Sequence, residues 1–170
     1  MLGWKELPFE VMQTGELYYD LLKSRRIKID KNKKIKEPVT LQDPCNIIRR
    51  AGAGEKFRYI VNATCENFID MKPNREHNFC CNAGGGLAAI SNWAAHKAKG
   101  NRVKAEQIKE TGAKIVTTPC HNCSTGIKDV VKYWKLGVKN MFFDEILVNT
   151  MVIPEGLKVG EEKETAKVGH

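Results

Sequence analysis

The residues of this sequence best suited to chemistry are its cysteines. Five of the six follow a spaced pattern: one cysteine, 34 residues, an adjacent pair, 38 residues, and two cysteines separated by two residues. These five are Cys45, Cys80, Cys81, Cys120 and Cys123. In a chain that lacks the basic and apolar pattern of a secretory signal, such spacing favours metal or redox chemistry over structural disulfides.

Three kinds of thiolate site are compatible with this pattern. A zinc site needs four ligands and normally takes them from two spaced pairs, and a cubane iron-sulfur cluster also needs four. Five cysteines that include an adjacent pair exceed both patterns, so iron-sulfur ligation is favoured. A zinc site and a metal-free thiol-disulfide site remain as alternatives. Cys65 stands outside the pattern, and we expect it to pack in the core.

Two predicted strands position two of the cysteines. A strand over 38–42 ends shortly before Cys45, and a strand over 113–117 ends shortly before Cys120. Each cysteine then lies near a helix N-terminus, where the helix dipole favours a thiolate. Because ligands bind at the carboxyl ends of parallel strands, we predict that the cysteines converge at that edge of the sheet.

The adjacent cysteine pair comes from a loop. The polar segment 71–78 delivers the pair, and three glycines follow shortly after it. We expect Gly84 and Gly85 to let the backbone approach a cofactor and donate N–H groups to it. His121 lies inside the CxxC motif and is a candidate proton donor, with a supporting role beside the ligands as the alternative.

The remaining periodicity indicates an α/β domain with a small parallel sheet and flanking helices. We predict helices over 14–25, 55–67, 87–98 and 102–111, an amphipathic helix containing residues 127–134, and a strand over 140–142 followed by a helix through residue 147. Residues 1–37 are expected to form an N-terminal helix and a basic connector, residues 38–150 a single domain, and residues 151–170 a disordered tail.

Composition and charge narrow the classes of partner. The 170 residues carry a net charge of +8, but the segment 23–36 alone holds eight basic residues against one acidic residue. We predict that this basic segment is a solvated connector, with docking onto an acidic protein as the alternative. Nucleic acid is not expected, because no aromatic residues lie between the lysines. No apolar run reaches the length of a membrane span, and a cytoplasmic location is predicted.

The motifs resemble the cysteine-rich CCG domain of heterodisulfide reductase. The similarity covers about residues 39–145 and is carried by DPCN at 43–46, NFCCNAGGG at 78–86 and TPCHNC at 118–123. The flanking residues look closest to DsrK-like subunits and related menaquinol-linked complexes. Three features differ from the family: Asn82 stands where the family has glycine, a single motif is present, and the cubane-binding cysteine run is missing.

The resemblance implies a noncubane [4Fe-4S] cluster with the five patterned cysteines as its ligands. It implies an oxidoreductase subunit of anaerobic metabolism that reduces or forms a disulfide, the substrate being a disulfide or a small sulfur-carrier protein. Because no other cofactor motif is present, electrons would come from an iron-sulfur or membrane-quinol subunit, and a membrane complex would be reached through that partner. A non-catalytic electron-transfer module and a zinc-binding structural domain remain as alternatives.

Overall fold

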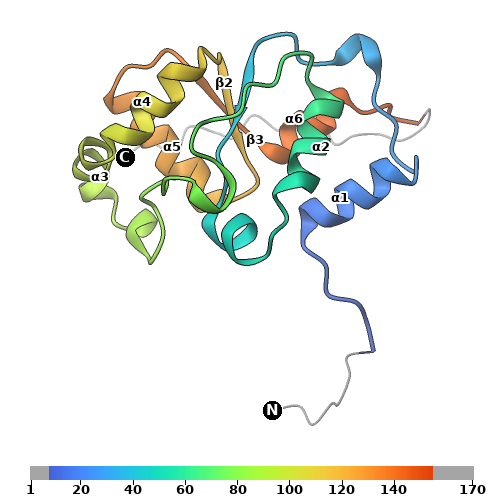
Figure 1. The fold of residues 1–170 in the computed structure, drawn as a ribbon, viewed down its shortest axis with the longest axis horizontal. Helices are drawn as coiled ribbons and strands as arrows, with labels where there is room; N and C mark the ends of the chain where they lie inside the picture. The colour runs from blue at the N-terminus through green and yellow to red at the C-terminus, as the bar shows by residue number, and fades with distance from the viewer. Residues whose placement is uncertain (1–7, 155–170) are drawn as a thin grey trace, which may run out of the picture.

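The structure, a computed structural model, describes residues 8–154 of the chain. Its centre is a three-stranded parallel sheet with β2 in the middle. The strands are β1 (Val39–Leu41), β2 (Ile115–Thr118) and β3 (Lys139–Phe142). Helices cover both faces of this sheet (Figure 1). The α/β class with a small parallel sheet and flanking helices is therefore confirmed.

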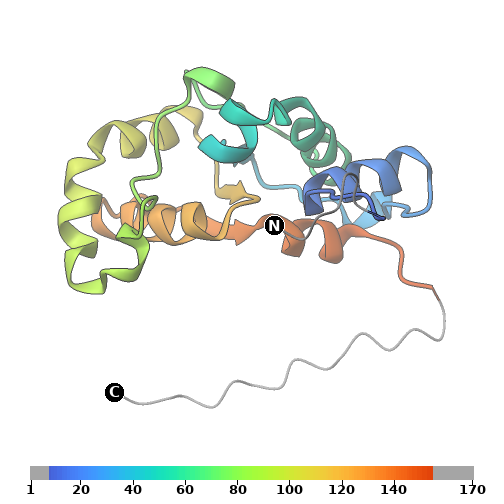
Figure 2. The same ribbon diagram turned by 90° about the horizontal axis from the view of Figure 1, so that it is seen from below.

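Side chains alternate between the two faces of the sheet and divide the core in two. One face, with Leu41 and Ile115, packs against α1, α2 and α6. The other face, with Val116, packs against α3, α4 and α5. The helices are α1 (Thr14–Lys23), α2 (Gly54–Thr64), α3 (Ala94–Gly100), α4 (Arg102–Thr111), α5 (His121–Tyr133) and α6 (Phe143–Thr150). Figure 2 shows α1 and α3 at opposite ends of the molecule.

The predicted helix over 87–98 is wrong in its first half. The structure has two separate 3-10 turns, Leu87–Ala89 and Ser91–Trp93, before α3 begins. The Leu87 carbonyl accepts a hydrogen bond from Lys97 Nζ at 2.7 Å and a 3-10 bond from the Ile90 amide at 3.3 Å. The Leu87 carbonyl thus accepts hydrogen bonds from groups other than the amide four residues later, which an α-helix would require. The α-helix starts only after the second 3-10 turn.

Cys65 lies just outside the helix that was predicted to contain it. The predicted helix over 55–67 ends at Thr64, and Cys65 instead forms a parallel bridge with Ile35. The Cys65 side chain is buried in the core, which confirms the predicted packing role. Burial raises the pKa of its thiol.

The basic segment is attached to the domain. Ile27, Ile29 and Ile35 pack against the same core as α1 and α2, while most of the basic side chains between them are exposed. Ile29 also forms an antiparallel bridge with Met151. The segment is solvated on one side, as predicted, but it does not run free. The domain boundary at 37/38 stays a prediction, and residues 155–170 of the predicted tail lie outside the described residues.

Candidate metal centre

Two cysteines lie where helical segments begin. Cys45 is the first residue of a six-residue π-helix, Cys45–Arg50, which follows β1 after three residues. Cys120 is the N-cap of α5, and Cys123 lies in the first turn of that helix. In Figure 1 the π-helix (cyan) and the beginning of α5 lie at the same lower edge of the molecule. Cys120 is thus beside the backbone N–H groups of Asn122 and Cys123, which favour its thiolate.

A buried ion-pair network ties the start of the Cys45 segment to the connecting loop (residues 70–79) that leads to Cys80. The Arg58 guanidinium from α2 binds Asp43 at 2.8 and 3.1 Å and Asp70 at 2.7 and 2.8 Å. The Arg58 side chain is 5% exposed and that of Asp43 is 1% exposed. The Arg75 amide donates to Asp43 Oδ2 at 2.6 Å. One arginine therefore fixes both segments that precede the exposed cysteines.

A second set of hydrogen bonds joins the π-helix to the end of the connecting loop. Arg49 donates to the Glu76 carbonyl at 2.7 Å and to both oxygens of Asn78 at 2.6 and 2.9 Å. Asn78 Nδ2 donates to the Asp43 carbonyl. Because Asn78 is two residues from Cys80 and Asp43 is two residues from Cys45, these bonds hold the two cysteines next to each other.

Helix α5 approaches the adjacent pair through a glycine. A Cβ added at Gly126 would lie 2.5 Å from the Cys81 carbonyl oxygen and 2.9 Å from Cβ of Ala83. Any larger residue would push the helix away from the Cys81 backbone. Gly126 therefore sets the distance between the CxxC motif at the start of α5 and the adjacent cysteine pair.

Asn82 occupies the position at which the family has glycine. Its φ of 63° lies in the left-handed region, which asparagine tolerates better than most residues. The Asn82 amide donates to Cys80 Sγ at 3.2 Å, and its side chain donates to the Lys97 carbonyl at 3.3 Å. The asparagine thus adopts the backbone conformation expected of the missing glycine.

Three of the thiols form a hydrogen-bonded group. The Cys123 thiol bonds Cys120 and Cys81, and these bonds raise its own pKa. The same bond from Cys123 lowers the pKa of Cys81 to about 7 and that of Cys120 to about 6. Backbone N–H groups of Asn122 and Cys123 also favour the Cys120 thiolate. These bonds favour the thiolate form, which is the form that binds metal, at Cys81 and Cys120.

The other two patterned cysteines lie on the open side of this group. Cys45 and Cys80 are exposed, Cys120 is partly exposed, and Cys81 and Cys123 are buried. Burial raises the pKa of Cys80, and negative charge at Cys81 and Cys45 raises it further. Cys81, Cys123 and Cys120 pack together, Cys80 is adjacent to Cys81, and Cys45 acts electrostatically on Cys80.

The donor set consists of thiol sulfurs, which are the ligands that iron-sulfur clusters use. Among the residues the structure describes, no three His, Cys, Asp or Glu side chains are arranged around one metal position. The site instead offers several sulfurs with nearby N–H donors, which iron-sulfur clusters use. Gly84 and Gly85 are exposed and have nothing within 4 Å of an added Cβ, so the backbone after the cysteine pair has open space beside it.

His121 lies at the start of α5 with its side chain exposed. Its ring makes an edge contact with Phe142, with the centroids 6.0 Å apart. Its charge is among the smaller causes that lower the pKa of Cys120. The imidazole is thus beside the group of thiols and open to solvent.

Three further residues contribute to the site but were not predicted from the sequence: Arg58, Gly126 and Lys104. Lys104 on α4 is 1% exposed, and negative charge at Cys81 acts on it. The only signals in the sequence were a charged residue or a glycine on the apolar face of a predicted helix.

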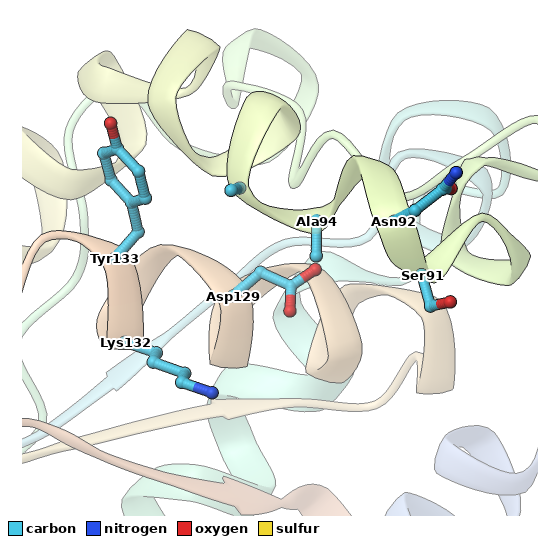
Figure 3. A pocket seen from close by; sticks show the side chains of 7 residues that line it. Ser91, Asn92, Ala94, Asp129, Lys132 and Tyr133 are labelled. Atoms are coloured by element: carbon cyan, nitrogen blue, oxygen red, sulfur yellow. The ribbon is translucent and has the colours of Figure 1, made fainter.

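A pocket lies away from the cysteines. It has a volume of about 430 Å³ and is formed by Ser91, Asn92, Ala94 and Ala95 on one side and by Asp129, Lys132 and Tyr133 of α5 on the other (Figure 3). None of its lining residues is a cysteine. It is therefore separate from the candidate metal centre.

Comparison with known proteins gives one family and several relatives. The model of the CCG cysteine-rich domain matches residues 39–128. The chain is 35% identical over 131 residues to a subunit of the dihydromethanophenazine:CoB--CoM heterodisulfide reductase of Methanosarcina acetivorans, covering 76% of this chain and 31% of the relative. It is 32% identical over 153 residues to the Hdr-like menaquinol oxidoreductase iron-sulfur subunit of Archaeoglobus profundus, covering 86% of this chain and 27% of the relative.

A more distant relative is the EtfAB:quinone oxidoreductase of Syntrophomonas wolfei, 27% identical over 150 residues, with 84% of this chain and 21% of the relative covered. The chain thus spans less than a third of the length of these relatives. No solved structure matches it significantly. Among the described residues, no helix is long and apolar enough to cross a membrane.

Proposed function

Because the chain belongs to the CCG cysteine-rich domain family, we propose that it is an iron-sulfur part of a heterodisulfide-reductase-like complex. In this proposal Cys45, Cys80, Cys81, Cys120 and Cys123 bind a noncubane [4Fe-4S] cluster, and Gly84 and Gly85 lie against it. The reaction is the reduction or formation of a disulfide, or of a related sulfur substrate.

One observation carries the proposal: Cys81 packs against Cys120 and Cys123 from another segment, and the pKa values of Cys81 and Cys120 are lowered. Cys45, from a third segment, acts on the neighbouring Cys80. Thiolates with a lowered pKa bind iron well. The exposed side of the group, formed by Cys45 and Cys80, gives a substrate sulfur a route to the cluster. The buried side, formed by Cys81 and Cys123, would anchor the cluster.

When bound, the cluster supplies electrons one at a time. Reduction of a disulfide consumes two electrons and two protons, breaks the S–S bond and yields two thiols. His121 is exposed next to Cys120, and we assign its imidazole to proton donation at the departing sulfur. The network around Arg58 keeps Cys45 and Cys80 in place during this step, because it fixes the segments on both sides of the opening.

The electrons must come from a partner. The relatives are named as subunits of heterodisulfide reductase and of Hdr-like menaquinol oxidoreductase, so we propose an iron-sulfur or membrane-quinol subunit as the donor. The disulfide substrate is either a small molecule or a sulfur-carrier protein. We place the chain in the cytoplasm, with any membrane association through its partner and with no role for nucleic acid.

Iron and sulfide counts on anaerobically purified protein, combined with EPR spectra with and without a thiol, test the cluster. We expect about four irons per chain, a spectrum that changes on thiol addition, and loss of iron in Cys45→Ser. Cys65→Ala is the matched control and should retain its iron, because Cys65 lies in the core. Stoichiometric zinc without sulfide would refute the proposal.

His121→Asn separates catalysis from electron relay. We expect normal iron content with turnover of a disulfide slower by about one hundredfold, the usual effect of losing a general acid. An unchanged rate would remove His121 from the mechanism. An EPR spectrum that is insensitive to thiol in the unsubstituted protein would favour a module that only transfers electrons.

A further inference from the structure

Helix α4 presents three buried polar side chains, one every three residues, to the loop that carries the adjacent cysteines. Asn101, the residue that caps α4, donates to the Cys80 carbonyl at 3.2 Å. Gln107 donates to the Pro73 carbonyl at 2.7 Å. Lys104 lies between them and contacts Gln107 Oε1 and, at 3.9 Å, the sulfur of Met71. The outer two residues hold backbone carbonyls, whereas the middle one is a cation.

The ammonium group of Lys104 is buried without a carboxylate partner. Its side chain is 1% exposed, and no ion pair in the described part of the chain includes it. Lys97, which is also buried, differs in having Asp129 at 3.8 Å. Burying a charge without a partner is costly, so the position of Lys104 calls for negative charge nearby.

The cysteine group is the main source of that negative charge. Burial lowers the pKa of Lys104 to about 8, while negative charge at Cys81 and then at Asp43 opposes that shift most strongly. Asp43 already binds Arg58 in two places. The cysteines are therefore the counter-charge that remains for Lys104.

We infer that Lys104 is the buried counter-charge of the metal centre and raises its reduction potential. The inference rests on the proposed function, since it requires a cluster on the cysteines. Each electron added makes a cluster and its thiolates more negative, so a fixed cation nearby stabilises the reduced state more than the oxidised state. Lys104 is thus a positioning and tuning residue, which does not itself touch substrate.

Redox titration of the anaerobic, cluster-loaded protein, followed by EPR, tests this role. Lys104→Met removes the charge and keeps an unbranched side chain, and Lys104→Gln removes the charge but keeps a hydrogen-bonding group. In both variants we expect the equilibrium constant for one-electron reduction to fall by about tenfold, which corresponds to about 59 mV. Lys97→Met combined with Asp129→Asn, the matched control, removes both charges of a pair and should leave the potential unchanged.

Urea unfolding of the cluster-free protein gives an independent readout. If Lys104 served only to hold Gln107 and the loop, Lys104→Met would destabilise the cluster-free chain. As a counter-charge without its cluster, Lys104 should be replaceable with no loss of stability, because the methionine removes a buried cation. A destabilised cluster-free variant would overturn the inference.

The outcomes separate this inference from the proposal it rests on. A cluster of unaltered potential in both Lys104 variants would overturn the inference and leave the proposed function intact. Loss of iron from both variants, with iron retained in the Lys97→Met, Asp129→Asn control, would assign Lys104 to assembly of the cluster and also overturn it. If the unsubstituted protein takes up no iron, the proposed function fails and the inference fails with it.

Discussion

Replacing Arg58 with methionine should remove the support of both exposed cysteines. Arg58 makes four side-chain hydrogen bonds to Asp43 and Asp70. Burial works to lower its pKa, but the bonds to the two carboxylates outweigh burial and raise it. In Arg58→Met, Asp43 stays buried at 1% exposure, and within the described residues the Arg75 amide is the donor that its carboxylate keeps.

The expected cost is large because only one partner of a buried pair is removed. Such changes typically cost about 3–5 kcal/mol, and Asp70, at 22% exposure, can regain water more easily than Asp43. Most of the cost should therefore arise at Asp43. Urea unfolding of the reduced, cluster-free protein, with an unchanged slope against urea concentration, measures it.

Two further variants make the result decisive. Arg102→Met breaks the exposed Arg102–Glu106 pair and should cost no more than about 0.5 kcal/mol. Asp43→Asn combined with Arg58→Met should recover part of the loss, because the uncompensated charge is gone. The reasoning is refuted if Arg58→Met costs less than about 1 kcal/mol or if the double variant is no better than the single one.

Other sites give smaller and more local effects. Gly126→Ala should lower iron content and destabilise the cluster-free chain by about 1–3 kcal/mol. Gly100→Ala, whose added Cβ would meet nothing within 4 Å, should do neither. Equal effects of the two variants would contradict the close approach of α5 to the Cys81 backbone. Alkylation of Cys120, followed by mass spectrometry across pH, should be half-maximal near its pKa of about 6. The unfolded thiol keeps its proton up to about pH 9. The Cys120 thiolate should therefore make the cluster-free chain more stable as the pH rises from about 6 to about 9, and this contribution should be absent below about pH 6. An alkylation midpoint near pH 9 would refute both the lowered pKa and the pH-dependent stability. Lys31→Glu with Lys33→Glu should weaken co-purification with the electron-donating subunit at low salt, and unchanged binding at every salt concentration would leave the basic segment without a docking role.

The sequence predicted the features that depend on local order. Helix α4 has the predicted bounds of 102–111, because its apolar spacing and the following Gly112 are local signals. The positions of Cys45 and Cys120 at the starts of helical segments follow from the strand and proline before each one. These features require no knowledge of which segments meet in space.

The features that sequence reasoning missed depend on long-range contacts. Arg58 falls beside Phe57 on the buried side of α2, and only the folded chain shows that two carboxylates from other segments reach it. The prediction of a helix over 87–98 was wrong for the same reason, because the Lys97 side chain donates a hydrogen bond to the Leu87 carbonyl. Gly126 gave a weak signal, because a glycine inside a helix costs about 1 kcal/mol relative to alanine and so suggests a close contact.

Arg58 and Lys104 have different roles at the candidate metal centre, one structural and one electrostatic. Arg58 is a cation between two carboxylates, so its charge is balanced before any metal binds, and its effect is to fix the chain around Cys45 and Cys80. Lys104 has no such balance within the described residues, and its charge is left to act on the cysteines. Arg58 should therefore determine whether the folded chain holds Cys45 and Cys80 close together. Lys104 should determine how readily the cluster-loaded centre accepts an electron. A variant at Arg58 should change stability and iron content with little effect on the potential of the remaining cluster, whereas a variant at Lys104 should do the reverse.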